Sequence, residues 1–212
     1  MPRLPFFTAA LAAALALSAC ATSPYTGPVE VTRFVAPPAE RAGLGSGTIA
    51  IAFPDGPENQ NARRAFAAAV GAELTRLGYT VVPEGAPADQ TAAVRTTRNA
   101  IAAAPRERQG PVSVGVGGGT GSFGSGVGLG VGINLGGGSE GPSAMTDLAV
   151  RITRAGGATL WEGRSQIETG VKSPYSQVDT SARALAAALF RDFPGGNGET
   201  VTIPVRKLQG TK

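Results

Sequence analysis

Residues 146–167 read TDLAVRITRAGGATLWEGRSQI and carry the clearest structural pattern of the chain. Apolar and polar residues alternate on both sides of the pair Gly156-Gly157, and a period of two indicates β-strands that bury one face. Two consecutive glycines favour a tight two-residue turn, because both central residues of such a turn adopt positive φ angles. We therefore predict a β-hairpin with strands Thr146–Ala155 and Ala158–Ile167.

Two independent patterns select one register for this hairpin. With the glycine pair as the loop, the apolar face pairs Ile152 with Trp161, Val150 with Gly163 and Leu148 with Ser165. The other face pairs Arg151 with Glu162 and brings Asp147 diagonally near Arg164. Cross-strand pairs contribute about 0.2 to 1 kcal/mol each. We interpret these charges as a solvated sheet face, and Glu162 has no evident partner for acid–base catalysis.

Two amphipathic helices flank the hairpin in sequence. The first is predicted from Asn59 to Leu77, with Gly78 as its C-terminal cap. The second begins at Ser176 or Asp179 and extends to Asp192. Further strands are predicted at 29–35, 48–53, 79–82, 91–99 and 200–205. This order predicts one α+β domain, a mainly antiparallel sheet with two helices on one face.

A glycine-rich insertion, residues 110–142, interrupts the pattern. Between Gly115 and Gly138 there are 13 glycines in 24 residues. Two interpretations stay open: a floppy surface insertion, which the composition favours, or a flat hairpin that adds to a sheet or stacks on a neighbouring molecule. Residues 119–124 match the GxGxxG motif of dinucleotide-binding sites, and Glu140 lies near the distance expected for a ribose-binding acid. Such a site requires a helix after the glycines, but here alternating glycines follow, so we reject this interpretation.

The N-terminus has the layout of an export signal. Arg3 precedes an apolar run from Pro5 to Leu17, which is shorter than the roughly 20 residues of a transmembrane helix. The segment Leu17-Ser18-Ala19-Cys20 resembles the lipobox of bacterial lipoproteins. That resemblance implies cleavage between Ala19 and Cys20 and attachment of fatty acyl chains (palmitate) to Cys20, and Ala21 after it resembles an outer-membrane address.

Composition excludes several classes of function. The chain has no histidine and a single cysteine, which excludes histidine-dependent catalytic triads and the usual zinc and iron sites. Removal of residues 1–19 takes one Arg from 19 basic residues and leaves 15 acidic ones, so the mature chain carries +3. These charges are scattered, and we predict no nucleic-acid binding. Lys172, Lys207 and Lys212 lie in loop or tail contexts, which argues against Ser–Lys catalysis. We predict no catalytic residues, no metal ligands and no cofactor.

The ordered features resemble a family of bacterial envelope lipoproteins that is known as domain of unknown function 4136. They are the lipobox at Cys20, the helix running into Leu77-Gly78-Tyr79, the glycine-rich insert, Leu160-Trp161-Glu162-Gly163 in a strand pair, and a closing helix that ends in Phe193-Pro194. The resemblance implies a fold and an envelope location but no chemistry.

We therefore expect a lipid-anchored protein on the periplasmic face of the outer membrane. The expected segments are a signal peptide (1–19), a lipidated tether (20–28), one α+β domain (29–205) with the insertion (110–142), and a tail (206–212). The expected function is non-enzymatic, a structural or assembly role through contacts with an envelope protein partner. The alternative is a binding module for a small apolar ligand or peptide, held between sheet and helices or along an exposed strand edge.

Overall fold

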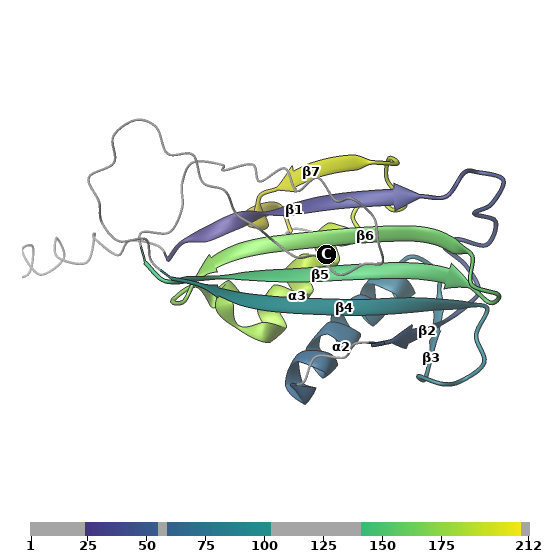
Figure 1. Ribbon diagram of the computed structural model, residues 1–212, viewed down its shortest axis with the longest axis horizontal. Coiled ribbons are helices and arrows are strands. Elements are labelled where there is room, and N and C mark those ends of the chain that lie inside the picture. The colour runs from purple at the N-terminus through teal and green to yellow at the C-terminus, as the bar shows by residue number, and fades with distance from the viewer. Residues whose placement is uncertain (1–23, 55–58, 103–140, 209–212) are drawn as a thin grey trace, which may run out of the picture.

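The computed structural model describes residues 24–54, 59–102 and 141–208, which form two layers (Figure 1). One layer is a seven-stranded sheet in the order β3-β2-β4-β5-β6-β1-β7, and helices α2 and α3 pack against one of its faces. The elements are β1 Thr26–Val35, β2 Thr48–Ala52, α2 Gln60–Arg76, β3 Thr80–Val82, β4 Gln90–Ile101, β5 Ser143–Arg154, β6 Thr159–Gly170, α3 Val178–Leu189 and β7 Glu199–Ile203, with short 3-10 helices η2 Pro174–Ser176 and η3 Val205–Lys207.

The α+β prediction is confirmed, and the sheet is mixed. Strands β4, β5, β6, β1 and β7 pair antiparallel, whereas β2 pairs parallel with both β3 and β4. The parallel pair arises because α2 carries the chain across the sheet between β2 and β3, and such a crossover returns the chain in the same direction. The first strand begins at Thr26 rather than Val29, inside the segment that we assigned to the tether.

The predicted hairpin register is confirmed along β5 and β6. Ile152 pairs with Trp161, and the other predicted apolar pairs and Arg151 with Glu162 also stand opposite each other, while Asp147 and Arg164 lie diagonally as predicted. The turn itself was predicted wrongly. The Arg154 N–H donates to the Ala158 carbonyl at 2.9 Å, so three residues close the loop, and a bulge beyond Ile152 restores the register. Both glycines keep the expected positive φ, at 102° for Gly156 and 93° for Gly157.

Helix α2 forms where the sequence predicts it, and both of its ends are capped. The Asn59 side chain accepts hydrogen bonds from the backbone of Asn61 and Ala62, which satisfies two of the free N–H groups of the first turn. At the other end the Tyr79 N–H donates to the Leu74 carbonyl and the Gly78 N–H to the Thr75 carbonyl, a Schellman motif. Gly78 has a φ of 104°, which favours glycine at this position.

Helix α3 ends at Leu189, before the predicted end at Asp192. A buried arginine near the C-terminal end of β1 determines where α3 ends. Arg33 is 3% exposed, and its guanidinium donates to the carbonyls of Leu189 (3.0 Å), Ala188 (3.1 Å) and Arg191 (2.8 Å). The last carbonyls of a helix lack successive N–H partners within it, although the Ala188 carbonyl also accepts from the Arg191 N–H at 3.4 Å. A cation at this position also interacts favourably with the helix dipole. Desolvation lowers the pKa of Arg33, while Glu199 and Asp192 oppose that effect.

The core between the layers is filled by apolar side chains and has an aromatic centre. The Trp161 ring is fully buried, stacks on Phe190 at 5.4 Å between centroids, and donates from Nε1 to the Pro194 carbonyl at 2.9 Å. Gly163, two residues further along β6, leaves the space that the Trp161 ring occupies. The fully buried side chains around this centre include Val29, Val31, Ile49, Val70, Leu74, Leu148, Ile152, Leu185 and Leu189.

Candidate functional site, a groove between the two helices

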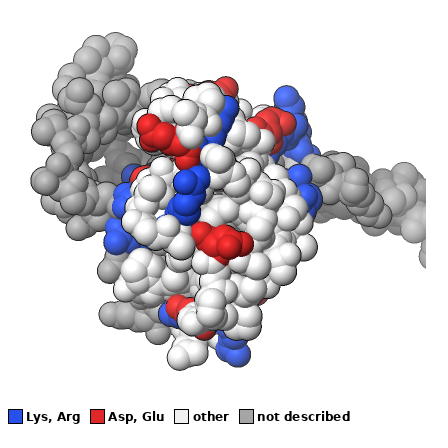
Figure 2. Space-filling view, turned by 90° about the vertical axis from the view of Figure 1, so that its right-hand side faces the viewer, with Lys and Arg blue, Asp and Glu red and all other residues white. Residues whose placement is uncertain are grey.

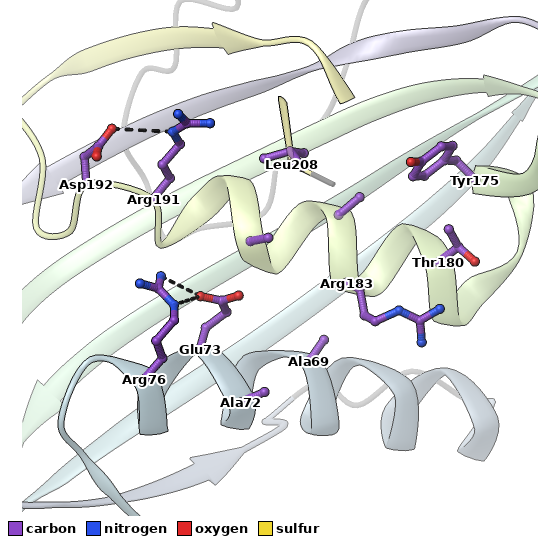
Figure 3. A pocket seen from close by; sticks show the side chains of 12 residues that line it. Ala69, Ala72, Glu73, Arg76, Tyr175, Thr180, Arg183, Arg191, Asp192 and Leu208 are labelled. Atoms are coloured by element: carbon purple, nitrogen blue, oxygen red, sulfur yellow. Dashed lines mark hydrogen bonds and ion pairs between the residues drawn. The ribbon is translucent and has the colours of Figure 1, made fainter. Parts of the chain in front are cut away.

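The candidate site is a groove of about 550 Å³ on the solvent side of the helix layer. It runs between α2 and α3, and the segment after α3 and Leu208, which follows η3, close it on one side (Figure 3). The lining residues come from both helices and their flanks: Ala69, Ala72, Glu73, Arg76, Tyr175, Thr180, Arg183, Ala184, Ala187, Arg191, Asp192 and Leu208.

The alanines of the two helices form the apolar part of the groove. Ala69 and Ala72 lie on α2, and Ala184 and Ala187 lie on α3. Residues three or four positions apart share one face of a helix, so each helix turns a small-residue stripe toward the other. An alanine fills less space than a larger apolar residue. The two helices therefore contact each other while a channel remains open along their outer side.

Charged side chains line the rim of the groove. On α2 the Arg76 guanidinium donates to Glu73 from Nε at 2.8 Å and from Nη2 at 2.7 Å. Beyond α3, Arg191 lies 3.7 Å from the Asp192 carboxylate and also donates to the Lys207 carbonyl. Arg183 lies on α3, further along the groove from both pairs, is exposed, and forms no ion pair or hydrogen bond within the described ranges (Figure 3). The groove therefore presents a guanidinium that is available to an anionic group.

The opposite face of the sheet is polar and is the solvated face that the sequence predicts. The predicted Arg151–Glu162 pair forms at 3.0 Å, and Arg164 contacts Asp147 at 2.6 Å. Asp147 also accepts a hydrogen bond from the Thr97 hydroxyl. These groups pair with one another, and Glu162 occupies an ion pair instead of facing a second acid or base.

A buried polar network ties the loop before β2 to the core. The Tyr79 hydroxyl accepts from the Gly45 N–H at 2.7 Å and donates to Gln90 Oε1 at 3.1 Å. The Gln90 amide then donates to the carbonyls of Gly43 and Ser46. Burial raises the pKa of Tyr79, and the Gly45 hydrogen bond opposes this shift. The network is satisfied internally, so we assign it a structural role.

A second polar contact fixes the start of β2. The exposed Asp89 carboxylate accepts from the Thr48 N–H at 2.9 Å and from the Thr48 hydroxyl at 2.7 Å. These bonds to the charged form lower the pKa of Asp89.

The predicted site residues Ala19 and Cys20 lie outside the described residues, as do most of the glycine-rich insertion and its GxGxxG motif. None of the helices in the described ranges has the length and hydropathy to cross a membrane. The described part of the chain also brings together no group of three or more carboxylates or thiols that could hold a metal ion.

The groove was not predicted from the sequence. The sequence does contain a pattern that belongs to the groove, because its lining residues recur three and four positions apart in both helices. Leu208 was assigned to a solvated tail, whereas it lies against the groove. A pattern of alanine and charge indicates the solvent side of a helix, but it carries no information about which second helix lies beside it.

No family model and no curated protein matches the chain. Among solved structures it is similar to a PDZ domain protein from Parabacteroides distasonis ATCC 8503, with 16% identity and a TM-score of 0.50. That match covers 91% of this chain and 42% of the other, so the chain spans less than half of that protein, and the likeness concerns the fold alone. A PelC dodecamer from Paraburkholderia phytofirmans matches with 11% identity and a TM-score of 0.39 over 76% of this chain and 93% of that one. A TM-score this low supports no further conclusion.

Proposed function

We propose that this protein is a lipid-anchored envelope lipoprotein of the periplasmic side of the outer membrane, related to the domain of unknown function 4136 family. The segment Leu17–Cys20 supports the anchor, because it places the chain's single cysteine directly after a short apolar signal. Two or three acyl chains attach a protein to a bilayer almost permanently, since each buried methylene contributes about 0.8 kcal/mol.

The protein acts through contacts with another protein and not as an enzyme. One observation carries this proposal: the groove combines an alanine floor with the exposed guanidinium of Arg183, which forms no ion pair within the described ranges. An alanine floor accepts the side chains of an incoming peptide segment. An acidic residue in that segment would pair with Arg183, as Glu73 pairs with Arg76 and Asp192 pairs with Arg191.

A crosslinking experiment tests the docking role. A photoreactive amino acid is placed at Thr180, which lines the groove, and in a matched control at Thr202, which is exposed on β7 away from it. Irradiation of intact cells should trap a discrete adduct only from position 180. The substitution Arg183→Glu should abolish that adduct, whereas Arg154→Glu at the hairpin turn should leave it intact. Equal adducts from positions 180 and 202 would contradict the proposal.

The anchor has a separate test. The substitution Cys20→Ser should release the protein from the membrane fraction, and mass spectrometry of the native protein should find acyl chains on Cys20. An unmodified thiol at that position, or membrane association that persists in the variant, would refute the anchor.

The second candidate is a binding module for a small apolar ligand or peptide. Side chains of the core cluster fill the space between sheet and helices where such a ligand was expected. The groove alanines and Leu208 are the apolar surface that favours this candidate. Copurification of a small molecule that Ala187→Gln displaces, without any protein adduct, would favour it over protein docking.

A further inference from the structure

The start of β1 and the end of β4 lie at the same end of the sheet. The Gly170 N–H donates to the Tyr25 carbonyl at 3.0 Å, just before β1 begins. Gly170 also pairs with Ser143, which pairs in turn with Ile101 at the end of β4. The chain therefore enters the sheet from Cys20 at the end that carries Ile101, the left-hand end in Figure 1. We call this the anchor-side end.

The anchor-side end exposes apolar side chains next to a cation. Val171 is 54% exposed and Ile101 is 39% exposed, and the neighbouring Pro142 is exposed as well. The Val171 N–H donates to the Pro142 carbonyl at 3.2 Å, which holds the two segments together. Lys172 follows and is also exposed. Apolar side chains with an adjacent ammonium suit a phospholipid surface, where the apolar groups enter the boundary region and the cation meets phosphate.

The length of the linking chain keeps this end close to the acylated residue. Four peptide steps separate Cys20 from Pro24, the first described residue, and four extended residues span at most about 14 Å. The polar headgroup zone on each side of a bilayer is roughly 5–8 Å thick, which is half of the difference between the total and the hydrocarbon thickness. If the acyl chains of Cys20 lie in the bilayer, this short link keeps the anchor-side end close to the membrane surface.

The opposite end of the sheet has a different surface. Basic side chains are interspersed there with acidic ones (Figure 2). Its loops carry the exposed residues Glu40, Glu84, Asp89 and Arg154. Phe34 is 56% exposed near this end of β1 and stands opposite Glu162. From Thr26 to Phe34 the strand covers about 26 Å, so Phe34 is a distant exposed apolar residue that serves as a matched control.

We propose that the anchor-side end lies against the headgroup surface of the bilayer, with Ile101 and Val171 at the boundary and Lys172 near phosphate. This inference rests on the proposed lipid anchor. It directs the long axis of the strands away from the membrane and places the charged loops at the far end. The occupant of this surface is the phospholipid layer itself.

Site-directed spin labelling tests the orientation. The single natural cysteine is Cys20, which acylation blocks, so an added cysteine is the only thiol that a label reaches. The variants are Ile101→Cys, Val171→Cys and the control Phe34→Cys, each in the full acylated protein on vesicles of phosphatidylethanolamine and phosphatidylglycerol. Collision with a water-soluble nickel chelate is compared with collision with oxygen. We expect nickel accessibility at positions 101 and 171 to be at least about threefold lower than at 34, because a headgroup layer excludes a polar complex.

A further variant separates contact from proximity. Val171→Asp in the protein labelled at 101 should raise nickel accessibility at least twofold, and Val81→Asp, at an exposed apolar position on β3, should not change it. Circular dichroism confirms that each variant is folded. Flotation of the protein with the vesicles reports the anchor independently. Failure to float refutes the proposed lipid anchor, whereas a protein that floats with equal nickel accessibility at 34, 101 and 171 refutes the orientation alone.

Discussion

Replacing Gly163 with alanine tests whether the space beside Trp161 limits the core. A Cβ atom at position 163 would lie 2.8 Å from Trp161 Cζ2 and 2.8 Å from Leu189 Cδ1, and closer still to another atom of the indole ring. Such approaches are far inside van der Waals contact. The indole cannot swing aside, because it stacks on Phe190 and its Nε1 is bonded to the Pro194 carbonyl. The substitution therefore has to displace a fully buried ring.

The expected loss combines two effects. Overpacking of a close-packed core costs about 1–3 kcal/mol, and a weakened buried hydrogen bond adds about 1 kcal/mol. Gly163→Ala should thus lower the free energy of unfolding by about 2–4 kcal/mol. For a domain of this size that corresponds to a fall in Tm of about 4–16 °C, at 2–4 °C for each kcal/mol.

Urea unfolding measures this loss, and Trp161 is the single tryptophan of the chain, so its fluorescence reports directly on the packing. A double-mutant cycle with Trp161→Phe, followed by circular dichroism, supplies the control. The smaller ring should accommodate the alanine, so the double variant should be more stable than the sum of the single effects by at least about 1 kcal/mol. A loss below 1 kcal/mol for Gly163→Ala, or simple additivity in the cycle, would show that the clash does not limit the core.

Three further predictions concern polar groups. Arg33→Met should destabilise the domain by about 3–5 kcal/mol in chemical unfolding, because it removes three hydrogen bonds to the Ala188, Leu189 and Arg191 carbonyls and leaves those carbonyls buried. Arg33→Lys should recover part of that loss. Equal stability of all three proteins would refute the capping role. Tyr79→Phe should cost about 1–2 kcal/mol in the same assay, since Gly45 and Gln90 lose their shared partner, and a neutral result would mean that water replaces the hydroxyl. The pKa of Asp89 is lowered in the folded state, so its contribution to stability is fully present above its unfolded pKa and disappears as the pH falls through the lower folded value. Asp89→Asn should therefore flatten the acid side of the curve of stability against pH. An unchanged curve would contradict this assignment.

The hairpin could be predicted in detail because its information is local. Alternation defines the buried face, Gly156-Gly157 marks the turn, and the charged pairs fix the register independently of the apolar ones. The turn differed by one residue, since a bulge next to Ile152 compensates for a longer loop without changing any pair beyond it. A strand can absorb an extra residue in this way, so register is more predictable than turn type.

The position of β2 was not predictable from its own residues. Alternation in Thr48–Ala52 indicates a strand and one buried face, but nothing in the segment specifies its neighbours. The structure inserts β2 between β3 and β4 in parallel with both, because α2 has to pack its apolar stripe on the same face as α3. Sheet order is thus a consequence of how the helices cover the sheet, which no short stretch of sequence encodes.

The end of α3 shows why long-range contacts limited the rest of the prediction. Helical spacing continues through Phe193, so the periodicity alone predicted a helix to Asp192. The helix stops earlier because Arg33, more than 150 positions away in the chain, donates to the Ala188, Leu189 and Arg191 carbonyls. The available signal was a cation on an otherwise apolar strand face, because Arg33 lies on the same face of β1 as Val31 and Val35. A charge at such a position requires acceptors inside the fold; the last turn of α3 supplies two of them, and Arg191 just beyond the helix supplies the third.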